Sequence, residues 1–337
     1  MTSLNYQPWK IDAAAFPSAG SFRDQLAFLV NYAVLAPSGH NTQPWKFIVS
    51  ENKMILAPEW SRDLPKSDPA HRQLFISLGC ALENLLIAAG QFGLNASVTY
   101  PSDTEENIIL SFDVWDRSKH SSPLFAAIPD RRSHRGSYFP EFPSENMPPL
   151  LELALPDTQI EIVRDERRFG LADLSIKAGI AAMTDDFRDE LSQYVIPNYS
   201  NRMVGMPGKC HNMPLPVSMI AGWLIKRVNV AKMNEGVERK LLERASPAFG
   251  IVTAIGDSRR DWIRAGQTFE RAALHATWRG MATAPLAAAV QVGDFFRDVQ
   301  KILGTMMRPL VMFRIGYPKK SAPHSPRLPA STVTQLA

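Results

Sequence analysis

Cysteine and long apolar runs are both scarce in this chain of 337 residues. Its two cysteines, Cys80 and Cys210, are too few to cross-link a chain of this length, so we expect a reducing, cytoplasmic compartment. Residues 1–10 are polar and lack the apolar core of a secretion signal. The longest apolar stretches, 85–89 and 282–290, are shorter than a bilayer-spanning helix, so we expect no membrane association. Cys80 falls in an apolar run and is expected to be a small buried side chain.

Three classes of function lack their usual signals. The net charge of +4 suits an anionic small ligand, but there is no lysine-rich run or basic helix, so nucleic acid is not an expected partner. The seven histidines lack zinc-like spacing, so no metal site is expected. No Gly-x-Gly-x-x-Gly fingerprint occurs, which argues against a Rossmann nucleotide-binding domain.

The chain does contain enough apolar residues for a large core and clear helix and strand patterns. Apolar residues make up 45% of it, and its length suits two domains or one large α/β domain. A capped amphipathic pattern predicts a helix over 21–36. Strands are predicted at 45–50 and 54–57, and a second strong helix over 73–92 ends at Gly93.

A pattern on that second helix occurs again in the later part of the chain. Each copy reads Gly-x3-Glu-x5-Ala-x3-Gly, with apolar strand candidates before and after it. Chance is the alternative, since Gly and Ala are common, but four matches in register favour an internal duplication. A duplicated chain builds alone an interface that otherwise needs a two-fold dimer, so we expect a monomeric pseudo-dimer or a further homodimer. The matched residues are Gly79, Glu83, Ala89 and Gly93, and Gly266, Glu270, Ala276 and Gly280.

The repeat divides the chain into two pseudo-symmetric halves. We place the first half at residues 1–125 and the second at 126–337, and we expect each to have a central sheet with packed helices. Residues 183–226 have no counterpart in the first half and are punctuated by Pro and Gly. This insertion is either a lid over a binding site or an ordered excursion at the surface.

A polar loop joins the first predicted helix to the first predicted strand. Pro37 ends the helix, Gly39 allows the backbone to approach a ligand, and Ser38 and Asn41 offer hydrogen-bond donors and acceptors. In isolation such residues cap backbone groups just as often. His40 could donate a proton, although a single loop histidine is more often incidental.

Arginine and serine residues in two distant segments form the second candidate site. Arg131, Ser133 and Arg135 alternate, so in an extended segment they point to one side, and guanidinium groups match phosphate oxygens. A solvated basic turn is the alternative. Arg327 lies in a proline-rich tail beyond the last predicted core strand, where it either contacts a phosphate or faces solvent.

Taken in order, these motifs resemble the FMN-dependent nitroreductase family, and most closely its Acg-like branch of internally duplicated chains. The resemblance rests on Pro-Ser-x-x-Asn-x-Gln-Pro-Trp at 37–45, Arg-Arg-Ser-x-Arg at 131–135, Arg-Ile-Gly-Tyr at 314–317 and Ser-Pro-Arg at 325–327. It extends over about residues 22–327. It implies an α+β, nitroreductase-like fold with FMN bound between two halves.

The resemblance also implies a role for each motif residue. Arg131 and Ser133 would sit at the FMN phosphate and ribityl chain, Arg327 would close on the phosphate, and Arg135 would reach the N1/O2 edge of the ring and serve catalysis. The first half lacks a matching Arg-Arg-Ser motif, so one complete site per chain is expected. The implied cofactor-binding residues are Pro37, Ser38, Gly39, Asn41, Arg131, Arg132, Ser133, Arg135, Thr283, Ala284, Pro285, Ser325 and Arg327.

The function implied is that of an NAD(P)H oxidoreductase. NADH or NADPH would supply hydride, which would pass through flavin N5 to a nitroaromatic or quinone-type acceptor. The first alternative is an FMN-binding storage or sensing protein without turnover, whose site the 183–226 insertion covers. A weaker alternative is a basic scaffold protein that binds no cofactor.

Overall fold

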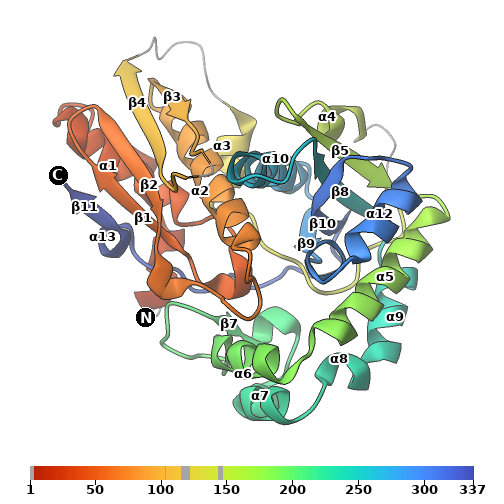
Figure 1. The fold of residues 1–337 in the computed structure, drawn as a ribbon. Helices are drawn as coiled ribbons and strands as arrows, with labels where there is room; N and C mark the ends of the chain where they lie inside the picture. The colour runs from red at the N-terminus through yellow and green to blue at the C-terminus, as the bar shows by residue number, and fades with distance from the viewer. Residues whose placement is uncertain (1–3, 103, 115–121, 143–146) are drawn as a thin grey trace.

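The computed structural model describes residues 4–102, 104–114, 122–142 and 147–337. Two β-sheets, each with its own helices, stand on either side of a pair of long central helices (Figure 1). Both helices and antiparallel sheets are therefore present in each part of the chain, which confirms the α+β class.

The first sheet has the strand order β11-β1-β2-β4-β3. Its four chain-consecutive strands pair antiparallel, while β11, from the C-terminus, lies parallel to β1. Helix α1 is closed at its start by a capping box between Ser21 and Asp24, as the sequence predicted. The elements are α1 (Phe22–Ala33), β1 (Trp45–Val49), β2 (Lys53–Pro58), α2 (Arg72–Gln91), β3 (Leu94–Thr99), β4 (Ile108–Val114) and β11 (Thr334–Leu336).

The second sheet repeats this topology with the order β5-β8-β10-β9, all antiparallel. By order, β5, β8, β10 and β9 correspond to β1, β2, β4 and β3. A long helix stands at the same place in each series, α2 between β2 and β3, and α10 between β8 and β9. The elements are β5 (Thr158–Val163), β8 (Ala248–Ala254), α10 (Arg259–Trp278), β9 (Ala282–Pro285) and β10 (Arg308–Gly316).

The two central helices touch backbone to backbone at the matched glycines. A Cβ atom built on Gly79 would lie 2.0 Å from the carbonyl oxygen of Ile263, and one on Gly266 would lie 2.1 Å from that of Ile76. The second pair of matched glycines follows the ends of these helices, and each has a φ of 75°, the left-handed value that favours glycine after a helix. Matched residues of the repeat therefore occupy equivalent places.

Helix α2 differs from expectation in one respect. By length and composition alone it is apolar enough to cross a membrane, with a mean hydropathy of 1.5 over 18 residues, although no long apolar run was expected. However, 78% of that window is buried inside the molecule, where α2 packs on α10 and α1. Burial on nearly all sides explains a composition that is apolar around the whole helix.

The stretch between β5 and β8 is the largest difference between the two sheets, because β1 and β2 are joined by a short turn. Helices α5 and α9 pack against the second sheet, whereas 183–226 has a small apolar cluster of its own around Val195, Ala221 and Ile225. Figure 1 shows α6, β7 and α7 below the two sheets. The elements are α5 (Arg167–Ala182), α6 (Asp185–Tyr194), β6 (Val195–Ile196), β7 (Met206–Pro207), α7 (Leu215–Arg227), α8 (Val230–Met233) and α9 (Glu235–Arg244).

After β10 the chain leaves the second sheet and returns to the first. Its last strand aligns Thr334 with Phe47 of β1, so the end of the predicted second half completes the sheet of the first half. Strand β11 therefore ties the two halves together. The remaining helices are α3 (Pro123–Ala127), α4 (Met147–Leu151), α11 (Ala288–Gln291), α12 (Phe295–Leu303) and α13 (Ala330–Val333).

Candidate functional site

A cavity of about 280 Å³ lies where the two halves, the insertion and the C-terminal tail meet. This volume is near the lower end of the range for small-molecule sites. Thr283 and Ala284 are expected site residues that do not line it; both are buried in β9. The expected residues that do line it are Pro37, Ser38, Gly39, Asn41, Arg131, Arg132, Ser133, Arg135, Pro285, Ser325 and Arg327.

The loop after α1 forms one wall and has an unusual backbone. His40, Asn41 and Gln43 have φ values of 48°, 57° and 55°, in the left-handed region that non-glycine residues rarely adopt. The Ser38 hydroxyl accepts a hydrogen bond from the Gln43 amide at 2.9 Å and so closes the loop. Since each such residue costs about 1 kcal/mol or more, contacts elsewhere must hold the loop in this shape.

Asn41 supplies several of those contacts. Its side-chain amide donates to the carbonyl oxygens of Gly205, in the insertion, at 2.9 Å and of Pro326, in the tail, at 3.0 Å. Its Oδ1 accepts a hydrogen bond from Arg327 at 2.7 Å. The polar groups of the Asn41 side chain therefore connect the loop after α1 to the insertion and to the C-terminal tail, which are distant from it in the sequence.

Two buried arginines stand behind the same loop. Arg131 Nη2 donates to the carbonyl oxygen of Leu35 at 2.9 Å, and its Nε lies 3.0 Å from a carboxylate oxygen of Glu270. Arg327 Nη2 donates to the carbonyl oxygens of Leu35 at 3.1 Å and Ala36 at 3.0 Å. Nη2 of Arg131 and both terminal nitrogens of Arg327 are thus bonded to protein, while Nε of each arginine and Nη1 of Arg131 make no hydrogen bond to the described residues.

Burial dominates the electrostatics of this cluster. It lowers the pKa of Arg327 to about 9, helped by the neighbouring charge of Arg131. It raises the pKa of Glu270 to about 7, against the opposing effect of Arg131. The Glu270 carboxylate is nonetheless the group that compensates the two buried cations.

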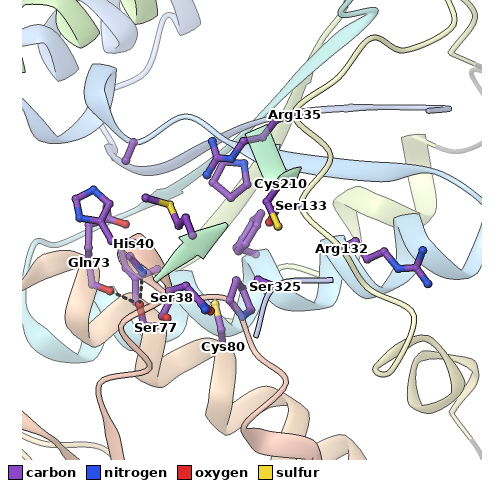
Figure 2. Close-up of a pocket in the computed structure, with 18 of the residues that line it drawn as sticks. Ser38, His40, Gln73, Ser77, Cys80, Arg132, Ser133, Arg135, Cys210 and Ser325 are labelled. Carbon is purple, nitrogen blue, oxygen red and sulfur yellow. Dashed lines mark hydrogen bonds between the residues drawn. The ribbon is translucent and has the colours of Figure 1, made fainter. Parts of the chain in front are cut away.

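Arg132 and Arg135 point in different directions from neighbouring positions (Figure 2). Arg132 is bonded to the tail, at 3.1 Å to His324 Nε2 and 2.7 Å to the Ser321 hydroxyl. Arg135 lines the cavity and makes no hydrogen bond or ion pair with the residues that the structure describes. Burial and the charge of Arg314 lower its pKa. Arg135 is therefore a cation that faces the cavity with its donors free.

The segment that carries these arginines is fixed by the second sheet. Ser133 forms an isolated bridge with Thr283, and the His134 amide donates to the carbonyl oxygen of Thr283 at 2.8 Å. Arg314 of β10 donates to the His134 carbonyl oxygen at 3.3 Å. Thr283 thus acts on the site through its backbone, which positions Ser133 and Arg135 along the cavity wall.

The N-terminal segment, which carries no motif that predicts a site, closes another side of the cavity. Trp9 lines it and donates from Nε1 to the carbonyl oxygen of Ser325 at 2.8 Å. Asn5 donates to the Ser200 carbonyl oxygen at 2.9 Å, and its own carbonyl accepts from the Arg327 amide at 2.9 Å. This segment therefore ties the insertion to the tail.

The insertion contributes Met206, Cys210 and His211 to the wall. None of the three was expected in the site. Nothing in the local sequence pattern shows which way these side chains face. Cys80 also lines the cavity; it is buried, as predicted, and its thiol contacts the Gly266 carbonyl oxygen at 3.3 Å.

The equivalent position in the repeated helix is filled by side chains. Cys80 follows the matched glycine Gly79 on α2, and Gln267 follows the matched glycine Gly266 on α10. The Tyr100 hydroxyl donates to Gln267 Oε1 at 2.8 Å, and the Arg264 guanidinium lies 5.0 Å from the centre of the Tyr100 ring. A second cavity at this equivalent position would require these groups to move.

Comparison with known proteins gives matches over nearly the whole chain, although no protein-family profile matches it. "Putative NAD(P)H nitroreductase Rv3131" of Mycobacterium tuberculosis (strain ATCC 25618 / H37Rv) is 27% identical over 335 residues, covering 95% of this chain and 92% of that protein. "Putative NAD(P)H nitroreductase acg" of the same strain is 24% identical over 331 residues, covering 92% and 95%.

Solved structures match a smaller part. The FMN-dependent nitroreductase NfnB from Mycobacterium smegmatis, in complex with NADPH, aligns with a TM-score of 0.44 and 18% identity over 64% of this chain and 98% of that one. An FMN- and NADPH-dependent NfnB from Sphigopyxis sp. strain HMH aligns with a TM-score of 0.43 and 17% identity over 63% and 97%. With TM-scores below 0.5, these likenesses support no functional conclusion.

The matches along nearly the full length agree with the motif order found in the sequence. They include the Acg protein itself and a second protein named as a nitroreductase, which cover 92% and 95% of this chain. The resemblance is therefore confirmed: this chain is similar, over nearly its entire length, to the Acg-like nitroreductases.

Proposed function

We propose that this chain binds FMN in the cavity and uses NADH or NADPH to reduce small electron-poor acceptors of the nitroaromatic or quinone type. The observation that carries the proposal is the free guanidinium of Arg135 in the cavity wall. The names of the full-length relatives point to the same class of activity.

The residues present fit a phosphate-bearing flavin. Four arginines line the cavity, against Asp68 as the acidic residue among the described lining residues. Such an excess of positive charge favours an anionic ligand. Free donors are also available, because the hydroxyl of Ser133 and Nη1 of Arg131 make no hydrogen bond to the described residues. A hydroxyl and a guanidinium are the groups that proteins commonly use to bind phosphate oxygens.

Two groups of residues would hold the cofactor. In direct contact we place Arg131 and Ser133 at the phosphate side, Arg135 at the electron-rich edge of the ring, and the loop of Pro37, Ser38 and Gly39 against the ring. Behind them are residues that keep these in place through the bonds described above. This second group is Asn41, Arg132, Thr283, Ser325 and Arg327, together with Ala284 and Pro285, which hold the strand of Thr283 against β10.

FMN, when bound, would supply the hydride chemistry, which would connect the nicotinamide to the acceptor through N5. The protein supplies charge and shape. Arg135 is a guanidinium, which stays protonated at neutral pH, and it compensates negative charge that develops near it. Partial exclusion of water from the cavity strengthens that interaction.

The insertion favours a second candidate function, a protein that stores or senses FMN without turnover. It is bonded to the first half beside the cavity: Gln43 Nε2 donates to the Met203 carbonyl oxygen at 2.7 Å, and the Glu190 carboxylate accepts from the amides of Lys66 at 2.9 Å and Ser67 at 2.8 Å. A segment held this firmly would keep nicotinamide away from a bound flavin.

One experiment separates the candidates. The purified protein is loaded with FMN, freed of excess cofactor, and mixed anaerobically with NADH or NADPH while flavin absorbance is followed. Loss of the oxidised flavin band, followed by its return on adding a quinone, supports the enzyme. Bound FMN that stays oxidised with both nicotinamides supports storage or sensing, and a protein that takes up no FMN contradicts both.

We also propose how the chain is organised. The shared strand order and the matched glycines support an internal duplication that lets one chain form the pseudo-dimer. Cys80 and Cys210 are both unpaired, which suits the reducing environment of the cytoplasm. Light scattering would show whether the protein is a monomer or forms a further homodimer.

A further inference from the structure

Three histidines in the cavity wall, His40, His211 and His324, each have one buried ring nitrogen without a partner among the described residues. The other ring nitrogen of His324 accepts a hydrogen bond from Arg132, whereas the rings of His40 and His211 make no hydrogen bond with the residues that the structure describes. An unsatisfied buried polar atom costs about 1–3 kcal/mol, so such atoms are rare unless a ligand or water completes them. His40 and His211 come from different parts of the chain, the loop after α1 and the insertion.

The conformation of His40 is held by its surroundings. Its backbone is left-handed, with a φ of 48°, and its ring lies 6.0 Å from the rings of both Phe187 and Tyr194 of α6. Strained backbone at a cavity is typical of residues kept for a function. The aromatic rings fix the direction of the imidazole, and Figure 2 shows it on the same side of the cavity as Ser38 and Gln73.

His211 lines the same cavity from the insertion. It ends the short 3-10 turn Gly208–His211, beside Cys210. Burial and the nearby charge of Arg135 lower the pKa of His40 to about 4 and that of His211 to about 3, and His40 itself contributes to the shift of His211. The two rings are therefore close enough to influence each other, and both are neutral at pH 7.

Neutral rings restrict what the pair can do. A neutral imidazole has one N–H donor and one acceptor, and it cannot release a proton as an imidazolium would. The pair can therefore form hydrogen bonds with a ligand, but it carries no positive charge and does not transfer a proton as an imidazolium would. Such donors suit the oxygen atoms of a planar, electron-poor group, while Arg135 disfavours any cationic ligand nearby.

We propose that His40 and His211 form the recognition subsite for the acceptor, and that the ring nitrogens that are not buried, His40 Nε2 and His211 Nδ1, donate hydrogen bonds to the oxygen atoms of its nitro or quinone group. This inference rests on the function proposed above. It assigns specificity to one residue from the first half and one from the insertion. The insertion is accordingly part of the substrate site.

The test measures binding rather than turnover. FMN-loaded, oxidised protein is titrated by calorimetry with 4-nitrobenzamide, and with benzamide as the analogue that lacks the nitro oxygens. His211→Phe keeps a ring without nitrogens, and His211→Asn restores a donor. His40→Gly removes the other ring, and its control is His71→Gly, which changes a histidine with a similar φ of 57° outside the cavity lining.

The wild type should bind 4-nitrobenzamide more tightly than benzamide. His211→Phe and His40→Gly should each weaken nitrobenzamide binding about tenfold, the equivalent of one lost hydrogen bond, and leave benzamide within twofold. His211→Asn should recover part of the loss, and His71→Gly should match the wild type. Equal affinity of all proteins for both compounds would overturn the proposal.

FMN uptake and bleaching by NADPH are recorded for the same proteins, which separates the two proposals. FMN uptake shows whether a variant still holds the cofactor, and bleaching shows whether nicotinamide still reaches it. If the wild type takes up FMN but is never bleached, the enzymatic function fails while the nitro-selective binding still tests the histidine pair. A variant that binds FMN normally but has lost nitro selectivity places the defect in recognition.

Discussion

At the scale of single residues, the site depends on which polar groups the protein leaves free. Arg131, Arg327 and Asn41 look equally suited to a ligand in the sequence, yet most of their hydrogen bonds go to backbone carbonyls near the loop. Arg135 differs because no described residue accepts from it. The free guanidinium is therefore the part of the motif with the largest expected effect on ligand binding.

Replacing Arg135 should weaken FMN binding. We expect Arg135→Gln to raise the dissociation constant for FMN by about 10- to 100-fold, because a charge-assisted hydrogen bond contributes roughly 1.5–3 kcal/mol. Titration of flavin fluorescence measures this. The control is Arg297→Gln, whose side chain is 67% exposed and pairs with Asp294 at the surface. Equal FMN affinity of the two variants would show that Arg135 is not a cofactor contact.

Local chemistry explains which site residues were predictable. Pro37, Ser38 and Gly39 line the cavity as expected, because a proline stop followed by small polar residues defines an exposed loop by itself. The partners of Arg327 and the direction of His211 depend on segments far away in the chain, and no local pattern encodes them. Trp9 was missed for the same reason.

At the scale of elements, the crossing of α2 and α10 sets the distance between the halves. The pattern of repeated glycines predicted long helices correctly and matched positions that meet in space. It could not show that the glycines serve a close contact, since a glycine within a helix has several explanations. The fold was predictable in class and in its helices, while the order of strands in each sheet needed the tertiary structure.

A side chain added at the contact between α2 and α10 should destabilise the protein strongly. Gly79→Ala would place a Cβ atom 2.0 Å from the Ile263 carbonyl oxygen, so we expect a loss of stability of about 3 kcal/mol or more. Gly90→Ala is the control on the same helix, where a Cβ atom meets nothing within 4 Å, and it should stabilise by up to about 1 kcal/mol. Urea unfolding measures both, and similar midpoints would refute the close packing of the helices.

The insertion is held by Glu190, whose buried carboxylate accepts from the amides of Lys66 and Ser67. We expect Glu190→Ala to expose α6 to proteases and to speed hydrogen exchange of those amides at least tenfold. Asp186→Ala is the control, because Asp186 pairs with the Lys66 ammonium but is 71% exposed, where an ion pair contributes little. Equal protection in the two variants would show that the insertion is held by other contacts.

At the scale of the whole molecule, buried histidines make stability depend on pH. The pKa values of His40, His211 and His324 are lowered from 6.5 to about 4, 3 and 3, so the unfolded chain binds more protons than the folded one below pH 6.5. Their contribution to stability is therefore complete above pH 6.5 and is lost as pH falls. Asp68 and Glu270, with pKa values raised to about 6 and 7, act in the opposite direction.

A single variant isolates the histidine contribution. The loss of unfolding free energy between pH 7.5 and pH 5 should be smaller in His211→Phe than in the wild type, because the variant has one fewer group that the unfolded chain protonates. Urea unfolding at the two pH values gives the loss of unfolding free energy for each protein, and the two losses are then compared. A pH-dependent loss that is equal in both proteins would mean that the His211 ring is not buried in solution.

The bond between the Arg327 amide and the Asn5 carbonyl has a consequence for biosynthesis. The wall of the cavity includes Trp9 and Arg327, which are far apart in the chain. During translation the early lobe can collapse, but the cavity cannot close until the segment that carries Arg327 has left the ribosome. A product that is truncated before Arg327 would lack this side of the cavity wall.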